Sequence, residues 1–112
     1  KMVRQDLYVN VLTPKEGSSS VAVVVFVKPS ELDNLKRTKV VLCKGGTAVR
    51  EQLVSLSEMK WGHLHVQTVG FARFLLDKSF CGQELSVYTV ISDPADVYCL
   101  EEERTTPFQF KL

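Results

Sequence analysis

Two histidines and three cysteines are the residues of this chain whose chemistry could support metal binding or nucleophilic catalysis. His63 and His65 are two positions apart, a spacing that lets a β-strand present both imidazoles to one metal ion. A structural zinc ion needs four ligands, and no cysteine or carboxylate stands at a recognised ligand spacing from this pair. We therefore predict no metal and no cofactor, and interpret both histidines as surface residues of a half-exposed strand.

Cys81 is the best candidate for a nucleophile, because the turn Phe80-Cys81-Gly82 favours exposure of its thiol. Cys43 and Cys99 lie in apolar segments, where cysteine acts as a small hydrophobic side chain. A cysteine nucleophile needs a base such as histidine, and nothing in the sequence brings one to Cys81. The chain is predicted not to be an enzyme, with a thiol-dependent enzyme using Cys81 as an alternative.

Charge and motifs argue against nucleic-acid and membrane partners. Fourteen Lys and Arg residues against 13 Asp and Glu residues give a formal net charge of +1, which creates no global field toward phosphates or acidic lipids. The segment Lys44-Gly45-Gly46-Thr47 has the residues of a phosphate loop in reversed order and predicts a hairpin turn. The longest apolar run, 21–27, is far shorter than the roughly 20 residues that span a bilayer.

Short segments of alternating apolar and polar residues dominate the chain, which has 45% hydrophobic and 24% charged residues. Gly, Pro and Asp residues separate these segments, and no repeated alternation of strand and helix calls for a parallel sheet. We predict one all-β domain over 1–112, an antiparallel two-sheet sandwich of immunoglobulin-like architecture with one or two short helices, excised from a larger protein. The expected strands are 6–12, 21–27, 38–43, 62–76, 85–91, 97–100 and 108–112.

Three local features are less regular. The segment 30–36 has a capping serine and leucines three residues apart, which predicts one helical turn. Residues 47–60 fit helical and strand spacing, and we favour a strand after a short helical start at Thr47. Gly70 interrupts a long apolar strand and predicts a bend or bulge there.

The order Cys43, Trp61, Cys99 and the ending Asp96-Val97-Tyr98-Cys99 are similar to immunoglobulin-type strands, although here tyrosine is adjacent to the cysteine rather than two residues before it. The resemblance implies an alternative in which Cys43 and Cys99 form a disulfide around Trp61. An odd number of cysteines without Cys-x-x-Cys spacing instead favours a reducing, intracellular and cytoplasmic location.

By elimination, the predicted function is that of a non-enzymatic protein-interaction or assembly module. Such a sandwich can bind another protein, or a second copy of itself, through an exposed strand edge or an outer sheet face. The candidate contact residues are Tyr8, Tyr88, Phe108 and Phe110. The alternative from a different class is a peripheral membrane or Ca²⁺-binding domain that uses the loops 14–20 and 93–96. Trp61 is expected in the core, or else as an interface anchor.

Overall fold

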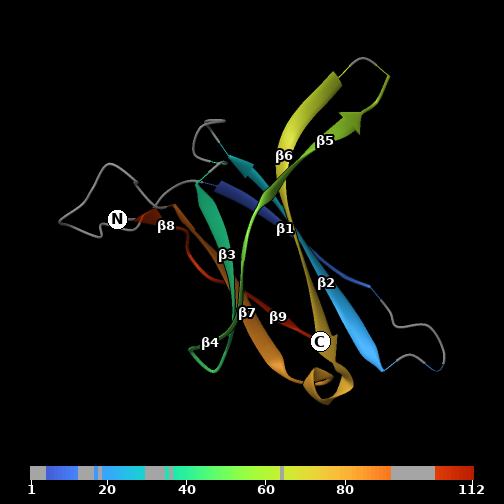
Figure 1. Ribbon diagram of the computed structural model, residues 1–112, viewed down its shortest axis with the longest axis vertical. Coiled ribbons are helices and arrows are strands. Elements are labelled where there is room, and N and C mark those ends of the chain that lie inside the picture. Colours follow the sequence, from blue (N-terminus) through green and yellow to red (C-terminus); the bar gives the residue numbers. More distant parts are fainter. Residues whose placement is uncertain are drawn as a thin grey trace.

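The computed structural model describes residues 5–12, 17, 19–29, 35, 37–63, 65–91 and 103–112, which form two antiparallel sheets packed as an all-β sandwich (Figure 1). This architecture confirms the prediction from period-two alternation. The elements are β1 Gln5–Leu12, β2 Ser20–Pro29, β3 Thr38–Lys44, β4 Thr47–Leu53, β5 Ser55–Trp61, β6 His65–Asp77, a single 3₁₀ turn Lys78–Phe80, β7 Glu84–Ile91, β8 Glu103–Arg104 and β9 Phe108–Lys111. None of the helical segments within these ranges is long and apolar enough to cross a membrane.

One sheet has the strand order β1-β2-β6-β5, and the other has the order β4-β3-β7. The short strands β8 and β9 both pair with β7 along its edge opposite to β3. All these pairings are antiparallel. The pairs β1–β2, β3–β4 and β5–β6 join consecutive strands, and the chain passes between the two sheets after β2, β4 and β6.

One side of the sandwich is closed by a continuous stretch of chain that runs from β4 in one sheet into β5 in the other. Only Val54 separates β4 from β5, so the chain leaves one sheet and joins the other within a single residue. The Val54 N–H donates to the carbonyl oxygen of Thr38 at 3.0 Å. A second link follows nearby, because the backbone N–H of Arg73 in β6 donates to Oε1 of Gln52 in β4 at 3.3 Å. The other edge strands, β1 of one sheet and β8 and β9 of the other, are on the opposite side of the sandwich.

The core between the sheets is filled by side chains at alternate positions of each strand. In β2 the apolar run has Val23, Val25 and Val27 in the core with no exposed surface, while Ala22 and Val24 on its other face are also buried. This confirms the expected strand 21–27, which pairs with β1 on one side and with β6 on the other. The other fully or nearly buried core residues are Leu35, Val40, Leu42, Ala72, Phe74, Leu76, Leu85 and Val87.

Two local expectations about the middle of the chain are wrong. Thr47 does not start a helix: it follows the turn Gly45-Gly46 directly and pairs with Lys44, so the ladder with β3 satisfies its backbone. Both turn glycines have positive φ, which explains why glycine stands there. His63 lies in the turn between β5 and β6 and not on a strand, while His65 begins β6. The two imidazoles therefore do not share a strand face.

The expected bulge at Gly70 is absent, since β6 pairs with β5 in unbroken register through this residue and its ladder with β2 ends there. A glycine is needed at position 70 for another reason. A Cβ at Gly70 would lie 2.7 Å from Cδ2 of Leu35 and 3.2 Å from Cγ2 of Val54, so these two side chains occupy the space over the strand.

We expect Gly70→Ala to lower the free energy of unfolding by about 1–3 kcal/mol, the usual cost of overpacking a core. Urea denaturation followed by circular dichroism measures this change. Leu35 supplies the closest atom, so the same substitution should cost less in a Leu35→Ala background. Equal costs in both backgrounds would contradict this explanation of Gly70.

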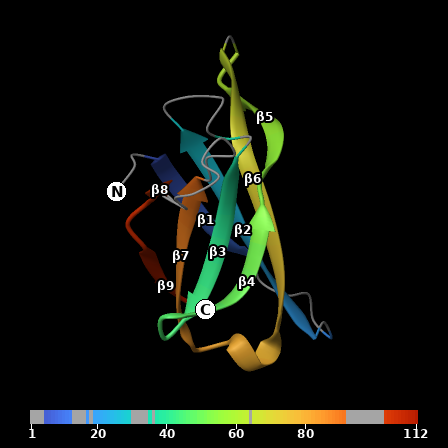
Figure 2. The same cartoon turned by 60° about the vertical axis from the view of Figure 1, so that its left-hand side comes forward.

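The hairpin β5–β6 extends beyond the two packed layers (Figure 2). Its strands pair from Ser55 opposite Phe71 out to Trp61 opposite His65. Leu56 and Val66 are exposed in this part, at 47% and 53%. The hairpin is consistent with the radius of gyration of 15.0 Å, against about 13 Å for a compact domain of this size.

Several expectations fall on residues that the structure does not describe. They are the strand 97–100, the loop 93–96, the helical turn 30–36 apart from the buried Leu35, and the loop 14–20 apart from residues 17, 19 and 20. The side chain of Trp61 is also outside the description, although its backbone lies at the far end of β5. The strand 108–112 is confirmed as β9, and the two-residue strand β8, Glu103–Arg104, lies outside the expected strands.

Candidate interaction surface

Half-exposed hydrophobic side chains gather along the open side of the sandwich, which we define by its edge strands β1, β8 and β9. In β1 the inward-facing Leu7 and Val9 are partly buried and pack against the core, whereas Val11 on the same face remains 41% exposed. Phe108 pairs with the core residue Val87, and it too remains 47% exposed. Both side chains are on the core side of an edge strand, so their exposure means that the open side is incompletely covered.

The outward face of β1 adds two further apolar residues. Tyr8 is 47% exposed and Leu12 is 49% exposed. Tyr8 stands opposite Phe26 of β2, which in turn stands opposite Phe71 of β6, so an aromatic row crosses three strands. The Phe26 and Phe71 rings are tilted, with centroids 5.6 Å apart. Four of the eight large hydrophobic side chains found exposed in the described ranges, Tyr8, Val11, Leu12 and Phe108, thus belong to the open side.

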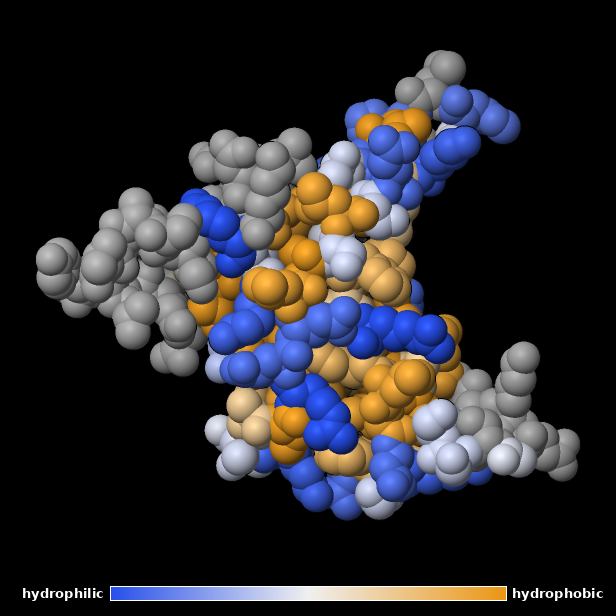
Figure 3. Space-filling view, viewed as in Figure 1, coloured by the Kyte–Doolittle hydropathy of each residue, from blue (hydrophilic) through white to orange (hydrophobic). Residues whose placement is uncertain are grey.

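The space-filling view agrees with this uneven distribution (Figure 3). Hydrophobic side chains on the face it presents flank a central band of hydrophilic ones, so the apolar surface is divided into patches. A single continuous apolar face does not form there.

The two edges of the open side differ in how well they are protected. Between the pairs Val87–Phe108 and Val90–Arg104, three residues of the outer strand face two of β7, so this edge is bulged. The bulge contains Pro107, and β8 is only two residues long. Bulges, proline and short strands all hinder pairing with a further strand. By contrast, β1 pairs with β2 in unbroken register over eight residues.

Thr105 holds the bulge against β7 with three hydrogen bonds. The backbone N–H of Thr89 donates to Oγ1 of Thr105 at 2.9 Å, and the two hydroxyl oxygens are 3.2 Å apart. The N–H of Thr105 donates back to the carbonyl oxygen of Thr89 at 3.0 Å. Both threonines are buried. The Thr105 hydroxyl therefore accepts the hydrogen bond of the Thr89 N–H at a point where the bulge interrupts the backbone ladder.

We expect Thr105→Val to lower the free energy of unfolding by about 1–3 kcal/mol, because it leaves the buried Thr89 N–H without its acceptor while it keeps the side-chain volume. Thermal or urea unfolding measures the change. Thr106→Val is the matched control, since Thr106 is exposed and its substitution should change stability by no more than about 0.5 kcal/mol. Similar effects of both variants would refute the proposed role of the Thr105 hydroxyl.

The four contact residues predicted from the sequence do not form one surface. Tyr8 and Phe108 lie on the open side, and Phe110 is partly buried against the core. The rings of Phe108 and Phe110 are stacked with centroids 6.5 Å apart. Tyr88 is half-buried on the outer face of the other sheet, where it packs against the separate cluster of Val41, Cys43 and Val90. Tyr8 and Tyr88 are thus on opposite faces of the sandwich.

Val11 and Leu12 belong to the open side but were not among the predicted contact residues. The sequence places Val11 on the inward face, and alternation alone treats every inward residue as core. It is a surface residue because none of the strands that the structure describes pairs with the outer edge of β1. No signal in the sequence shows that absence.

The residues with catalytic chemistry are far apart. Cys81 follows the end of β6 whereas His65 begins it, and the 13 residues of β6 span about 40 Å at about 3.3 Å per residue. His63 is in the turn next to His65. Within the ranges that the structure describes, no three His, Cys, Asp or Glu side chains come together in a way that could hold a metal ion.

The thiols that the structure describes are both free. Cys43 is buried and Cys81 is exposed, so the alternative disulfide of Cys43 is not formed, and Cys99 lies outside the described residues. Burial raises the pKa of the Cys43 thiol, and the nearby Glu51 carboxylate raises it further. Cys43 therefore acts as a packing residue and not as a nucleophile.

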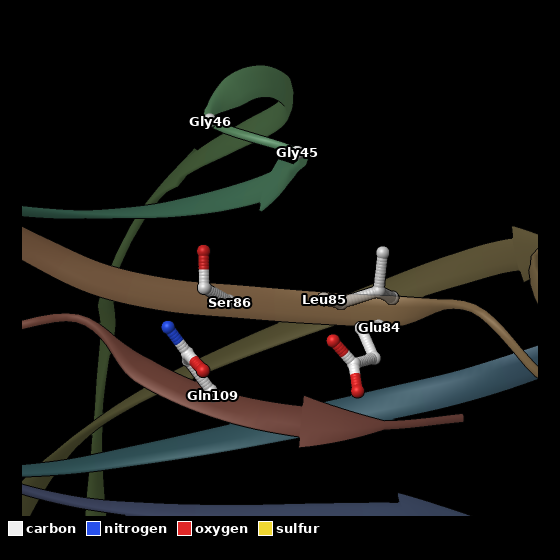
Figure 4. A pocket seen from close by; sticks show the side chains of 6 residues that line it. All are labelled: Gly45, Gly46, Glu84, Leu85, Ser86 and Gln109. Carbon is white, nitrogen blue, oxygen red and sulfur yellow. The ribbon is translucent and has the colours of Figure 1, made fainter.

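A small hollow lies between the turn Gly45-Gly46 and the strands β7 and β9 (Figure 4). Ser86 points from β7 toward this turn, whereas the Glu84 side chain of β7 points away from it, to the side where Gln109 of β9 lies. The hollow has a volume of about 170 Å³. Ligand pockets are typically about 300–1,000 Å³ and mostly apolar, so this polar hollow does not fit a small-molecule ligand.

Comparison with known proteins gives no match: no family model, no curated protein and no solved structure is similar to this chain. The function therefore has to be argued from the geometry of the described residues.

Proposed function

We propose that this domain is a non-enzymatic protein-interaction module that binds an extended protein segment at the edge of β1. The observation that carries the proposal is the open side, where Tyr8, Val11, Leu12 and Phe108 remain half-exposed. A segment that pairs with β1 would add a strand to the sheet, and its side chains would alternate between the two faces. One strand could then cover inward-facing Val11 and Phe108 and outward-facing Tyr8 and Leu12 together.

The composition of β1 supports strand addition. From Leu7 to Leu12 the strand has no charged residue and no proline, the two features that most often prevent an edge from pairing. Its second edge has no pairing partner within the ranges described. Backbone hydrogen bonds along this edge would supply affinity, while the half-exposed side chains would select segments that are apolar on both faces.

The arrangement of thiols and imidazoles supports binding rather than catalysis. A catalytic site needs convergent ionisable groups, and β6 keeps Cys81 away from His63 and His65. The free thiols of Cys43 and Cys81 favour a reducing compartment, which supports an intracellular site of action.

The proposal is tested by selecting binders from a phage-displayed library of random linear peptides. We expect selected peptides to have apolar residues at successive positions of an extended segment and to protect the backbone amides of β1 from hydrogen exchange. Peptides that protect only other strands, or a library that gives no binder to the monomeric chain, would overturn the proposal.

Val11→Lys should weaken binding of the selected peptides at least about tenfold, because an inward-pointing charge at an edge strand opposes pairing. Titration calorimetry measures the change in Kd. Val66→Lys is the matched control: Val66 is an exposed strand valine on the projecting hairpin, away from the open side, and its substitution should leave Kd unchanged. Circular dichroism establishes that both variants are folded. Equal weakening by both variants would place the binding surface elsewhere.

A further inference from the structure

The segment that best fits the edge of β1 is β1 itself, and we propose that two copies of this chain associate through antiparallel pairing of their β1 strands. This inference rests on the proposed function, because it names the partner of the same edge. The strand that the open side requires is apolar on both faces. In β1, Leu7, Val9 and Val11 form one face, and Tyr8 and Leu12 supply apolar side chains to the other.

Symmetry selects how the two strands align. Residues directly opposite each other in a sheet share a face, so a two-fold axis has to pass through a residue and not between residues. An axis at Val9 pairs residues 6–12 of both copies and places the exposed Val11 of one copy opposite Leu7 of the other. An axis at Tyr8 would place Val11 opposite the polar Gln5, and an axis at Asn10 would pair fewer residues of β1. The alignment at Val9 is the one that covers Val11 with an apolar side chain over the longest overlap.

The absence of charge repulsion also fits self-association. The only charged residue of β1 is Asp6, and the axis at Val9 sets it opposite Leu12 and not opposite a second aspartate. Tyr8 then stands opposite Asn10 on the outer face. The β8–β9 edge is less suited to the same contact, because its bulge at residues 105–107 interrupts the ladder.

Pairing at Val9 joins the two four-stranded sheets into one sheet of eight strands with a closed two-fold interface. Such isologous contacts are the commonest basis of soluble dimers. Each copy thereby supplies a strand to the free β1 edge of the other.

The test uses sedimentation equilibrium of the whole chain over a wide concentration range, with two double variants that differ at one exposed position. In the proposed dimer, residue 8 of each copy stands opposite residue 10 of the other. The variant Tyr8→Lys with Asn10→Lys therefore has two Lys–Lys pairs across the axis. The variant Tyr8→Lys with Asn10→Glu has two Lys–Glu pairs. We expect the unchanged chain to shift from monomer to dimer mass, and the second variant to dimerise about tenfold more tightly than the first, since each cross-strand pair changes from repulsion to attraction.

Equal dimerisation of the two double variants would overturn the inference, because residues 8 and 10 would not face each other. A chain that is monomeric at every concentration, but whose β1 amides are protected by selected peptides, would also overturn it and would leave the proposed function standing with another protein as the partner. A chain that neither dimerises nor binds peptides would overturn both.

Discussion

Replacing Leu42 with alanine is expected to lower the free energy of unfolding by about 2–5 kcal/mol. Leu42 lies in the centre of β3 with no exposed surface and packs in the core between the sheets. Its truncation removes apolar contacts and leaves a cavity that closes only in part, because β3 is paired with β4 on one side and with β7 on the other. Urea denaturation should show a lower midpoint with an unchanged m-value.

Leu75→Ala is the control for this prediction. Leu75→Ala removes the same number of carbon atoms as Leu42→Ala, but the Leu75 side chain is 58% exposed on the outer face of β6. Its substitution should cost about 0.5 kcal/mol or less. If Leu75→Ala destabilised the domain as much as Leu42→Ala, the assignment of core and outer faces would be wrong.

Replacing Val54 with proline is expected to cost about 2–5 kcal/mol, at the upper end of single-substitution effects. Proline has no N–H, so the carbonyl oxygen of Thr38 would lose its donor at the residue where the chain crosses between the sheets. The Val54 side chain also packs against the core. The loss of the hydrogen bond and of the packing therefore act on the same junction.

Val54→Ala separates these two contributions, because it keeps the N–H and removes only the packing. We expect it to destabilise the domain less than Val54→Pro does, as measured by the shift in the urea midpoint. Hydrogen exchange should also accelerate more at β4 and β5 in the proline variant. Equal effects would mean that the backbone link to Thr38 does not hold the two sheets together.

The strands themselves were largely predictable because their signal is local. The β-branched run 21–27 and the alternation in 85–91 and 108–112 identify strands and their faces without knowledge of their neighbours. The helical start at Thr47 was wrong for the opposite reason. Helical spacing of apolar residues was present there, but pairing with β3 outweighs local preference once the hairpin at Gly45-Gly46 has formed.

Gly70 shows a second kind of error. A glycine in a strand predicts a bulge when only the strand is considered. In the folded chain, Leu35 and Val54 approach from segments distant in sequence and occupy the position of a side chain. The need for glycine is therefore a property of the packed core, and local analysis cannot distinguish it from a bulge.

The proposed interaction edge depends even more strongly on the fold. Residues 108–112 were expected to be an exposed strand, and they are an edge, but the bulge at Thr105 protects it. Tyr8 was a candidate contact residue, but β1 has the same apolar alternation as buried strands, so nothing in its sequence identifies it as an edge strand. Strand order, and not composition, makes β1 available for pairing.

The amino-acid sequence by itself determined that this chain forms short, two-faced strands in an all-β sandwich, because the direction of successive side chains in a strand follows a fixed period of two. Only the tertiary structure decided that β4 and β5 close one side, that Tyr8 and Tyr88 lie on opposite faces, and that β1 is left at an open edge. These features depend on which strands pair across long stretches of chain, and the free energy of those pairings belongs to both partners and is not encoded in either strand alone.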